Sequence, residues 1–308
     1  MPAWWLGPDL SVFADSDLLD RAARPVFSAL AEPTRTPAPH ALVLSSTVET
    51  DGVALALDGH RLATCPDEAA LTFFLESLLT HLATQGNRSH LVLHAGLVQW
   101  RGQLIALPGE RGAGKSTTTL WLARRGGTYL GDDLCFIDLD TLTLRGLAKA
   151  ATLKQGSFAL YPESETFTDP LRGPVRYFLP PRIRGPHEPG LPLTRLVFPR
   201  YTPDAPTRAE PLPAPLAALA LVQQTYGGGE WGERALRAAA AFSASATVCP
   251  SSVRISERSS RMPISSSTTS ICAIFSSLWM FQRCLPVLPA RVPEAGVCSP
   301  RLRWAGDC

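Results

Sequence analysis

The chain has 308 residues, of which 45% are hydrophobic, and this is enough to bury the core of one large domain or two modest ones. Its formal net charge of +2 gives no reason to expect a nucleic acid or an anionic membrane as partner. The sequence lacks both a continuous apolar run of about 18 residues and the basic and apolar segments of a signal peptide. These absences predict a cytoplasmic protein that does not bind a membrane.

Residues 1–88 are expected to form a small N-terminal α+β subdomain. Two apolar runs separated by Thr-Asp-Gly predict antiparallel strands, and two stretches carry apolar residues at helical spacing. The first helix is expected to be interrupted at Pro25, because a proline inside a helix removes a hydrogen bond and crowds the preceding turn. In chain order the predicted elements are a helix at 17–30, a proline-rich linker at 33–39, strands at 42–44 and 53–57, and a helix at 68–83.

Residues 89–243 are expected to form a mixed sheet of the α/β class that contains a P-loop. A strand, a glycine-rich loop, a helix and a further strand follow one another in the order that a phosphate-binding βαβ unit requires. Farther along, frequent prolines predict loops between short strands. The predicted elements are strands at 91–98, 104–107, 128–130, 175–179 and 194–198, and helices at 116–125, 215–226 and 233–241.

The loop at residues 109–116 matches the full Walker A pattern, G-x-x-x-x-G-K-S. Its glycines allow backbone N–H groups to turn inward, where they form a nest for phosphate with the N-terminus of the following helix. Lys115 is expected to reach the β- and γ-phosphates of ATP, and the Ser116 hydroxyl to ligate Mg²⁺. The expected nucleotide-binding residues are Gly109, Glu110, Arg111, Gly112, Ala113, Gly114, Lys115, Ser116 and Thr117.

An acidic pair, Asp132 and Asp133, follows the strand after the loop helix. A right-handed crossover makes the strands before and after that helix parallel, so the pair should lie at the same sheet edge as the loop. Two adjacent carboxylates beside magnesium can divide the work, one holding the metal and the other accepting a proton. The alternative is that the pair forms only a polar turn.

His94 lies within the predicted strand at 91–98, which should border the strand that leads into the loop. A histidine in an apolar strand is often a packed core residue. At this place it is equally suited to orient a carboxylate or to contact a substrate, since imidazole readily exchanges protons. Both interpretations stay open.

The residues from His94 to Asp133 resemble the catalytic core of the HPr serine kinase/phosphorylase family, in which a histidine strand precedes the P-loop and an Asp-Asp pair follows after one helix. The resemblance implies the fold of the HPr kinase C-terminal domain, with ATP and Mg²⁺ as cofactors. It implies Asp132 as the base that deprotonates a serine hydroxyl and Asp133 with Ser116 as magnesium ligands. It also implies catalytic roles for Lys115, on the γ-phosphate, and for His94, close to the reacting groups.

Two departures from the family favour a substrate other than HPr. The glutamate-bearing signature expected after the acidic pair is not recognisable at 144–151, and Thr117 stands where the family usually has glutamate. The expected acceptor is therefore a serine of another protein or peptide, or a small alcohol. The resemblance is compatible with a homo-oligomer. Cations expected to assist at the γ-phosphate are Lys154, Arg172, Arg176, Arg182 and Arg184.

The alternative function is a P-loop ATPase or nucleotide-binding protein with no phosphoryl acceptor. The sequence has neither the Leu-Ser-Gly-Gly-Gln-like signature of an ABC ATPase nor the Asn-Lys-x-Asp motif of a small GTPase. Residues 244–308 change abruptly to a composition rich in Ser, Cys, Pro and Arg, without helical or strand periodicity. A disordered tail and a reading frame shifted after Ser243 both explain this change, and no chemistry is expected there.

Overall fold

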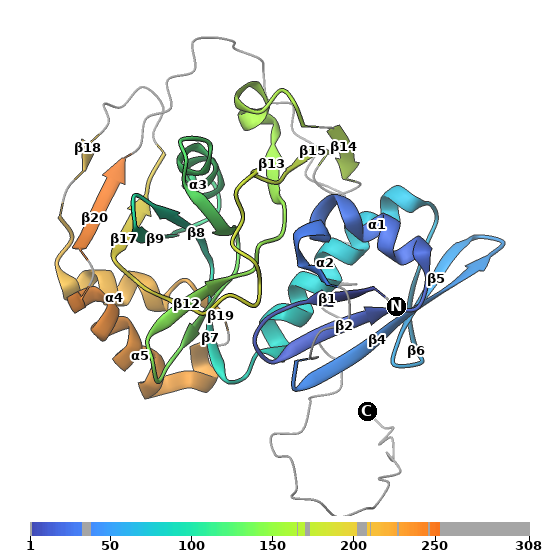
Figure 1. The fold of residues 1–308 in the computed structure, drawn as a ribbon, viewed down its shortest axis with the longest axis horizontal. Helices are drawn as coiled ribbons and strands as arrows, with labels where there is room; N and C mark the ends of the chain where they lie inside the picture. Colours follow the sequence, from blue (N-terminus) through green and yellow to red (C-terminus); the bar gives the residue numbers. More distant parts are fainter. Residues whose placement is uncertain are drawn as a thin grey trace, which may run out of the picture. The chain divides into compact units, whose positions relative to one another are not determined.

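The computed structural model describes residues 2–32, 38–164, 166–169, 173–201, 208–209, 211–226, 228–245 and 247–252. Arg172, residues 33–37 of the expected linker and residues 253–308 of the expected tail lie outside this set. The chain from Met1 to Ser259 forms one compact unit. The fold is mixed α/β, with four sheets among the described strands (Figure 1).

The first sheet is built entirely from the beginning of the chain and has the strand order β3-β1-β2-β4-β5-β6. The helices α1 and α2 contact one another, and each also contacts this sheet (Figure 1). The strands predicted at 42–44 and 53–57 and the helix predicted at 68–83 are confirmed within it. The elements are β1 Ala3–Trp5, β2 Leu10–Ala14, α1 Asp17–Phe27, β3 Ala31–Glu32, β4 His40–Glu49, β5 Gly52–Leu57, β6 His60–Cys65 and α2 Glu68–Gly86.

Helix α1 continues through Pro25, so the predicted interruption at this residue is wrong. The helix ends at Phe27, and a short 3₁₀ turn at Ser28–Leu30 follows. A proline inside a helix costs about 3 kcal/mol. Burial of Val26 and Phe27 in the last turn offsets this cost, since each such side chain contributes about 1.5–3 kcal/mol.

Three further sheets follow. The two larger of these three have the strand orders β10-β8-β9-β17-β20-β18 and β16-β12-β11-β7-β19, and the smallest has the order β13-β15-β14. The strands are β7 His90–Leu93, β8 Ala95–Trp100, β9 Gln103–Pro108, β10 Thr128–Gly131, β11 Cys135–Asp138, β12 Thr143–Gly146, β13 Ala151–Lys154, β14 Thr166–Asp169, β15 Gly173–Phe178, β16 Leu191–Pro192, β17 Arg195–Pro199, β18 Arg208–Ala209, β19 Thr225–Tyr226 and β20 Thr247–Ser252. The helices are α3 Lys115–Arg124, α4 Ala214–Val222 and α5 Gly228–Ser245, with a 3₁₀ segment, η2, at Gln155–Leu160.

Strands β9 and β10, which flank α3 in the chain, run in the same direction. Each of them pairs antiparallel with β8, which lies between them. The expected parallel relation is therefore correct, although the two strands are not neighbours. Because both strands end at one edge of the sheet, the loop after β9 and the acidic pair after β10 meet there.

The strand predicted at 91–98 is in fact two strands that belong to different sheets. β7 pairs with β11 and β19, whereas β8 pairs with β9 and β10. His94 lies at the break between them, and its backbone N–H donates to the carbonyl of Gln224 at 2.7 Å. This contact with a distant part of the chain accompanies the transfer from one sheet to the other, so His94 is not a mid-strand residue as predicted.

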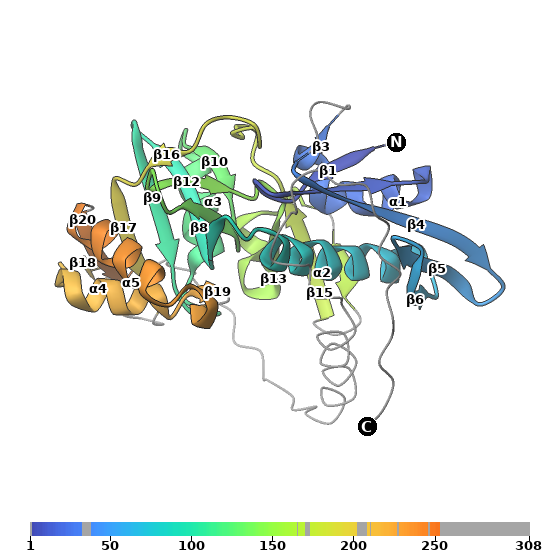
Figure 2. The same cartoon turned by 90° about the horizontal axis from the view of Figure 1, so that it is seen from below.

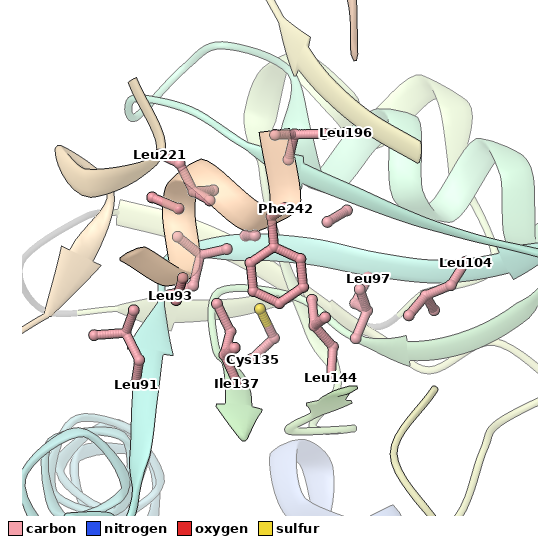
Figure 3. Close-up of a cluster of buried hydrophobic side chains, with 14 of the residues drawn as sticks. Leu91, Leu93, Leu97, Leu104, Cys135, Ile137, Leu144, Leu196, Leu221 and Phe242 are labelled. Atoms are coloured by element: carbon pink, nitrogen blue, oxygen red, sulfur yellow. The ribbon is translucent and has the colours of Figure 1, made fainter. Parts of the chain in front are cut away.

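Helices α4 and α5 bury their apolar faces against the two larger sheets (Figure 3). Phe242 of α5 and Leu221 of α4 join a core that includes Leu93 of β7 and Leu97 of β8. The helix predicted at 215–226 ends earlier, because residues 225 and 226 form β19, and the helix predicted at 233–241 is longer at both ends. Strand β20 then pairs parallel with β17, so regular structure extends past the expected boundary at residue 243.

Candidate functional site

The loop at residues 109–114 joins β9 to α3 and is called the glycine loop here. Gly112 and Gly114 have φ values of 86° and 95°, in the left-handed region that glycine adopts without strain. Gly114 is the N-cap of α3, and this helix has no side chain that caps its first N–H groups. The unpaired N–H groups and the dipole of a helix N-terminus form a binding site for anions.

Lys115 opens α3 and is 6% exposed. Its ammonium donates to the carbonyl oxygens of Gly109 at 2.7 Å and Glu110 at 2.9 Å. Burial lowers the pKa of this lysine, while the nearby carboxylates of Asp132 and Asp133 oppose that shift. The predicted contact with phosphate therefore requires the ammonium to exchange its present acceptors for phosphate oxygens.

Asp132 follows β10 and is 1% exposed. Neither of its carboxyl oxygens has a hydrogen-bond partner of standard geometry among the described residues. Burial and the adjacent Asp133 raise the pKa of Asp132 to about 6, against the opposing effects of the Ser116 hydroxyl, Lys149 and Lys115. Asp132 is thus a buried carboxyl with unused acceptor oxygens beside the glycine loop.

Asp133 has a different environment. Its Oδ2 lies 3.0 Å from the Lys149 Nζ, and its Oδ1 lies 3.8 Å from the His94 Nε2. Although burial acts in the opposite direction, Lys149 and His94 hold the pKa of Asp133 well below its usual value. The φ of Asp133 is 76°, a left-handed conformation that aspartate adopts more readily than most residues. The ion pair with Lys149 fixes the orientation of this carboxylate.

The sequence did not identify three residues that border this site. Lys149 is buried against Asp133, and its second carboxylate partner is Glu76 of α2. Tyr226 of β19 packs its ring 5.8 Å from the ring of His94. Lys149 had a signal, since a lysine inside the apolar run Leu-Ala-Lys-Ala-Ala is buried only when it is paired.

Thr117 and most of the predicted assisting cations have local contacts. The Thr117 hydroxyl lies 3.2 Å from the Ser157 hydroxyl, in the η2 segment. Arg176 donates to the carbonyl oxygens of Phe158 and Tyr161, and Arg184 pairs with Glu188.

Of the predicted cations, Lys154 is close enough to Lys115 to lower its pKa, and Arg111 of the loop acts in the same way. Arg182 has a backbone role, with its carbonyl accepting from the Tyr129 N–H.

Gly96 of β8 lets α3 and the acidic pair approach the sheet closely. A Cβ at this position would lie 2.1 Å from the Thr119 Oγ1 and 3.4 Å from the Asp132 Oδ1. We expect Gly96→Ala to destabilise the protein by about 1–3 kcal/mol, because an overpacked interior must shift. Urea denaturation measures the change. Gly156→Ala is the control, since a Cβ there meets nothing within 4 Å, and equal stability of the two variants would contradict the expectation.

The donor atoms at the site fit magnesium. Within the described ranges no group of three or more His, Cys, Asp or Glu side chains is gathered to hold a metal ion. Mg²⁺ does not need such a group, since it is usually held by one or two carboxylates together with substrate phosphates and water. The Ser116 hydroxyl beside the acidic pair is an oxygen donor of this kind. Separately, none of the described helices combines the length and apolarity needed to cross a membrane.

Comparison with known proteins gives little guidance. No protein-family model and no curated protein matches the chain. One solved structure that resembles it is the Hpr(Ser) kinase/phosphatase from Coxiella burnetii, at 12% sequence identity and a TM-score of 0.24, with 62% of this chain and 90% of that chain covered. A similarity this distant carries no argument about the site, so its chemistry is inferred from the geometry described above.

Proposed function

We propose that the protein is an ATP- and Mg²⁺-dependent kinase that transfers the γ-phosphate to a hydroxyl, either a serine of a protein or peptide or a small alcohol. The observation that carries the proposal is the Asp132 carboxyl, which is buried with no hydrogen-bond partner of standard geometry among the described residues and lies beside Ser116 and Lys115 at the start of α3. A buried acid without partners is costly to keep. Its position beside the glycine loop would allow it to act on a substrate bound there.

The glycine loop supplies the groups that hold a triphosphate. The N–H groups at the start of α3 bind phosphate oxygens, and Lys115 neutralises charge at the β- and γ-phosphates. Lys154 and Arg111 add positive charge close to Lys115. Phosphoryl transfer depends mainly on such positioning and charge neutralisation, because the protein forms no covalent bond to the phosphoryl group.

The two aspartates divide the remaining work. Asp132, with unused oxygens, accepts the proton of the attacking hydroxyl as general base. The Ser116 hydroxyl would hold Mg²⁺, which when bound would neutralise negative charge on the phosphates. The metal role predicted for Asp133 is less well supported, since its oxygens face Lys149 and His94. In the proposed mechanism Asp133 stays ionised, and His94 lies next to it near the reacting groups.

The pH dependence of kcat/KM tests the base. Asp132 must be ionised to accept a proton, and its pKa is raised to about 6. We therefore expect kcat/KM, which reports the free enzyme, to fall about tenfold for each pH unit below about 6 and to level off above it. Initial rates measured in constant-ionic-strength buffers give the profile. Equal kcat/KM at about pH 5 and about pH 7.5 would remove Asp132 from this role.

The function itself is tested by following the γ-phosphate. The full chain is incubated with radiolabelled ATP, magnesium and fractionated cell lysate, and mass spectrometry identifies the molecule that gains a phosphate. The expected result is label on a serine or an alcohol. Release of free phosphate with no labelled acceptor would support the ATPase alternative, and ATP binding without turnover would leave only a nucleotide-binding protein.

A further inference from the structure

Lys149 connects the acidic pair to a residue far earlier in the chain. Its side chain is 1% exposed, and lysine is almost never buried to this extent unless it is paired. The Nζ lies 3.0 Å from the Asp133 Oδ2 and 3.6 Å from the Glu76 Oε1. One buried cation therefore bridges two carboxylates, of which only one belongs to the proposed reaction centre.

The other end of the bridge is held firmly. Glu76 accepts from the Thr152 hydroxyl at 2.7 Å through Oε1 and from the Tyr177 hydroxyl at 3.0 Å through Oε2. Both of its oxygens are thus committed to fixed donors on β13 and β15. A buried carboxylate with donors on both oxygens has one preferred orientation, and it presents a fixed negative charge to Lys149.

The backbone of Lys149 is fixed as well. Its carbonyl oxygen accepts from the Tyr129 hydroxyl at 2.8 Å, and Tyr129 is completely buried in β10, the strand that leads directly into Asp132. Lys149 is therefore held at its main chain from the same strand that carries the acidic pair. The start of the Lys149 side chain is therefore fixed, and its ammonium is held by the ion pairs with Asp133 and Glu76.

Glu76 belongs to α2, the helix that packs on the N-terminal sheet. Figure 2 shows α2 passing beside β13 and β15, the strands whose hydroxyl groups hold Glu76. The helix thus reaches across from the first sheet toward the strands that follow the acidic pair. Glu76 is the residue of α2 that pairs with Lys149.

We propose that Lys149 is a positioning residue for the acidic pair and that Glu76 holds Lys149 in place, so that helix α2 is part of the catalytic unit. The inference rests on the proposed kinase function. Asp133 has a left-handed backbone and a like charge as its neighbour. Lys149 compensates that charge and fixes the direction of the Asp133 carboxylate, which keeps the unpaired Asp132 oxygens in position for the acceptor hydroxyl.

Four variants of the full chain test the inference: Lys149→Met, Lys149→Arg, Glu76→Gln and the control Thr72→Ala. Thr72 is buried on α2 one turn before Glu76, and its hydroxyl donates only to the Glu68 carbonyl of its own helix among the bonds described. The control therefore perturbs the same helix without touching the ion pairs. Folding of each variant is checked by circular dichroism and thermal melting before any assay.

We expect Lys149→Met to lower kcat by about 10²-fold and Glu76→Gln by about tenfold, with KM for ATP changed less than about threefold, because a misplaced catalytic group costs rate rather than nucleotide binding. Lys149→Arg should recover part of the loss, since it keeps the charge. Thr72→Ala should keep kcat within about twofold of the parent protein. Folded Lys149→Met with unchanged kcat, or a Thr72→Ala variant with the same loss as Glu76→Gln, would overturn the proposal.

If Lys149→Met does not fold, the double variant Glu76→Gln/Lys149→Met takes the place of Lys149→Met in the series, because it also removes the glutamate charge that Lys149→Met leaves unpaired.

A second measurement does not depend on activity. His94 pairs with Asp133, so its ring ¹H–¹⁵N resonances, recorded without nucleotide, report the position of that carboxylate. They should move in the Glu76 and Lys149 variants and stay in place in Thr72→Ala. Unmoved resonances would refute the positioning role, whether or not the parent protein transfers phosphate. If the resonances move but no phosphate is transferred, only the kinase proposal is refuted.

Discussion

Replacing Asp132 with asparagine is expected to make the protein more stable and to slow phosphoryl transfer by about 10²–10⁴-fold. Burial and Asp133 raise the pKa of this carboxyl from its ordinary 3.8 to about 6, which corresponds to a penalty of about 3 kcal/mol for the ionised form. The amide removes the charge but needs hydrogen bonds of its own. A net gain of about 1–3 kcal/mol in the free energy of unfolding is therefore expected above pH 6.

The sign of the pH dependence follows from the same shift. Because the folded-state pKa of Asp132 lies above its unfolded value, the penalty is fully present above pH 6 and disappears as the pH falls toward 3.8. Urea denaturation of Asp132→Asn and the parent protein should show the largest difference near neutral pH and a shrinking one in acid. A variant less stable than the parent protein at every pH would contradict this expectation.

The catalytic half of the prediction has a separate measurement. Loss of a general base lowers kcat by about 10²–10⁴-fold, while the loop that holds the nucleotide is unchanged. Isothermal titration should therefore find ATP binding with magnesium within several-fold of the parent protein. Asp140→Asn, which replaces an exposed acid in the turn between β11 and β12, is the matched control and should change neither quantity. Loss of magnesium-dependent binding in Asp132→Asn would reassign Asp132 from base to metal ligand.

Replacing Lys115 with methionine is expected to weaken ATP binding by about 10²-fold. In the proposed function the ammonium binds the β- and γ-phosphates, and removing one partner of a buried charge pair typically costs about 2–5 kcal/mol. Titration of ATP into the folded variant gives the dissociation constant. Arg101→Met is the control, because it removes a positive charge from the turn at the opposite end of the β8–β9 hairpin. Equal affinity of Lys115→Met and the parent protein would exclude the loop as the nucleotide site.

Local patterns in the sequence predicted the part of the fold that carries the glycine loop. The apolar strand before residue 109, the helix after it and the acidic pair at 132–133 are each specified by their own neighbours in the chain. The break at His94 is different, since it is defined by pairing with β19 and a contact with Gln224. A run of apolar residues in the sequence does not indicate which distant strand it will pair with, so β7 and β8 were predicted as one strand.

The ion pairs of the site were outside the reach of sequence patterns for a similar reason. Glu76 is an ordinary acidic residue of a helix until Thr152 and Tyr177, from a distant part of the chain, enclose it. The end of the folded part was misplaced because β20, with a proline and two serines, lacks the alternation of a typical strand. Strand β20 forms because it pairs parallel with β17, and its own composition does not predict a strand.

The contacts of Lys115 also bear on which anions the proposed site would prefer. Its ammonium already has two good acceptors in the Gly109 and Glu110 carbonyls, so an incoming anion gains only the difference between old and new bonds. A single inorganic phosphate offers one set of oxygens and gains little from this exchange. A triphosphate engages the helix N-terminus and the ammonium together, and the linked contacts reinforce one another. If the loop binds ATP as proposed, we therefore expect it to prefer a triphosphate to inorganic phosphate.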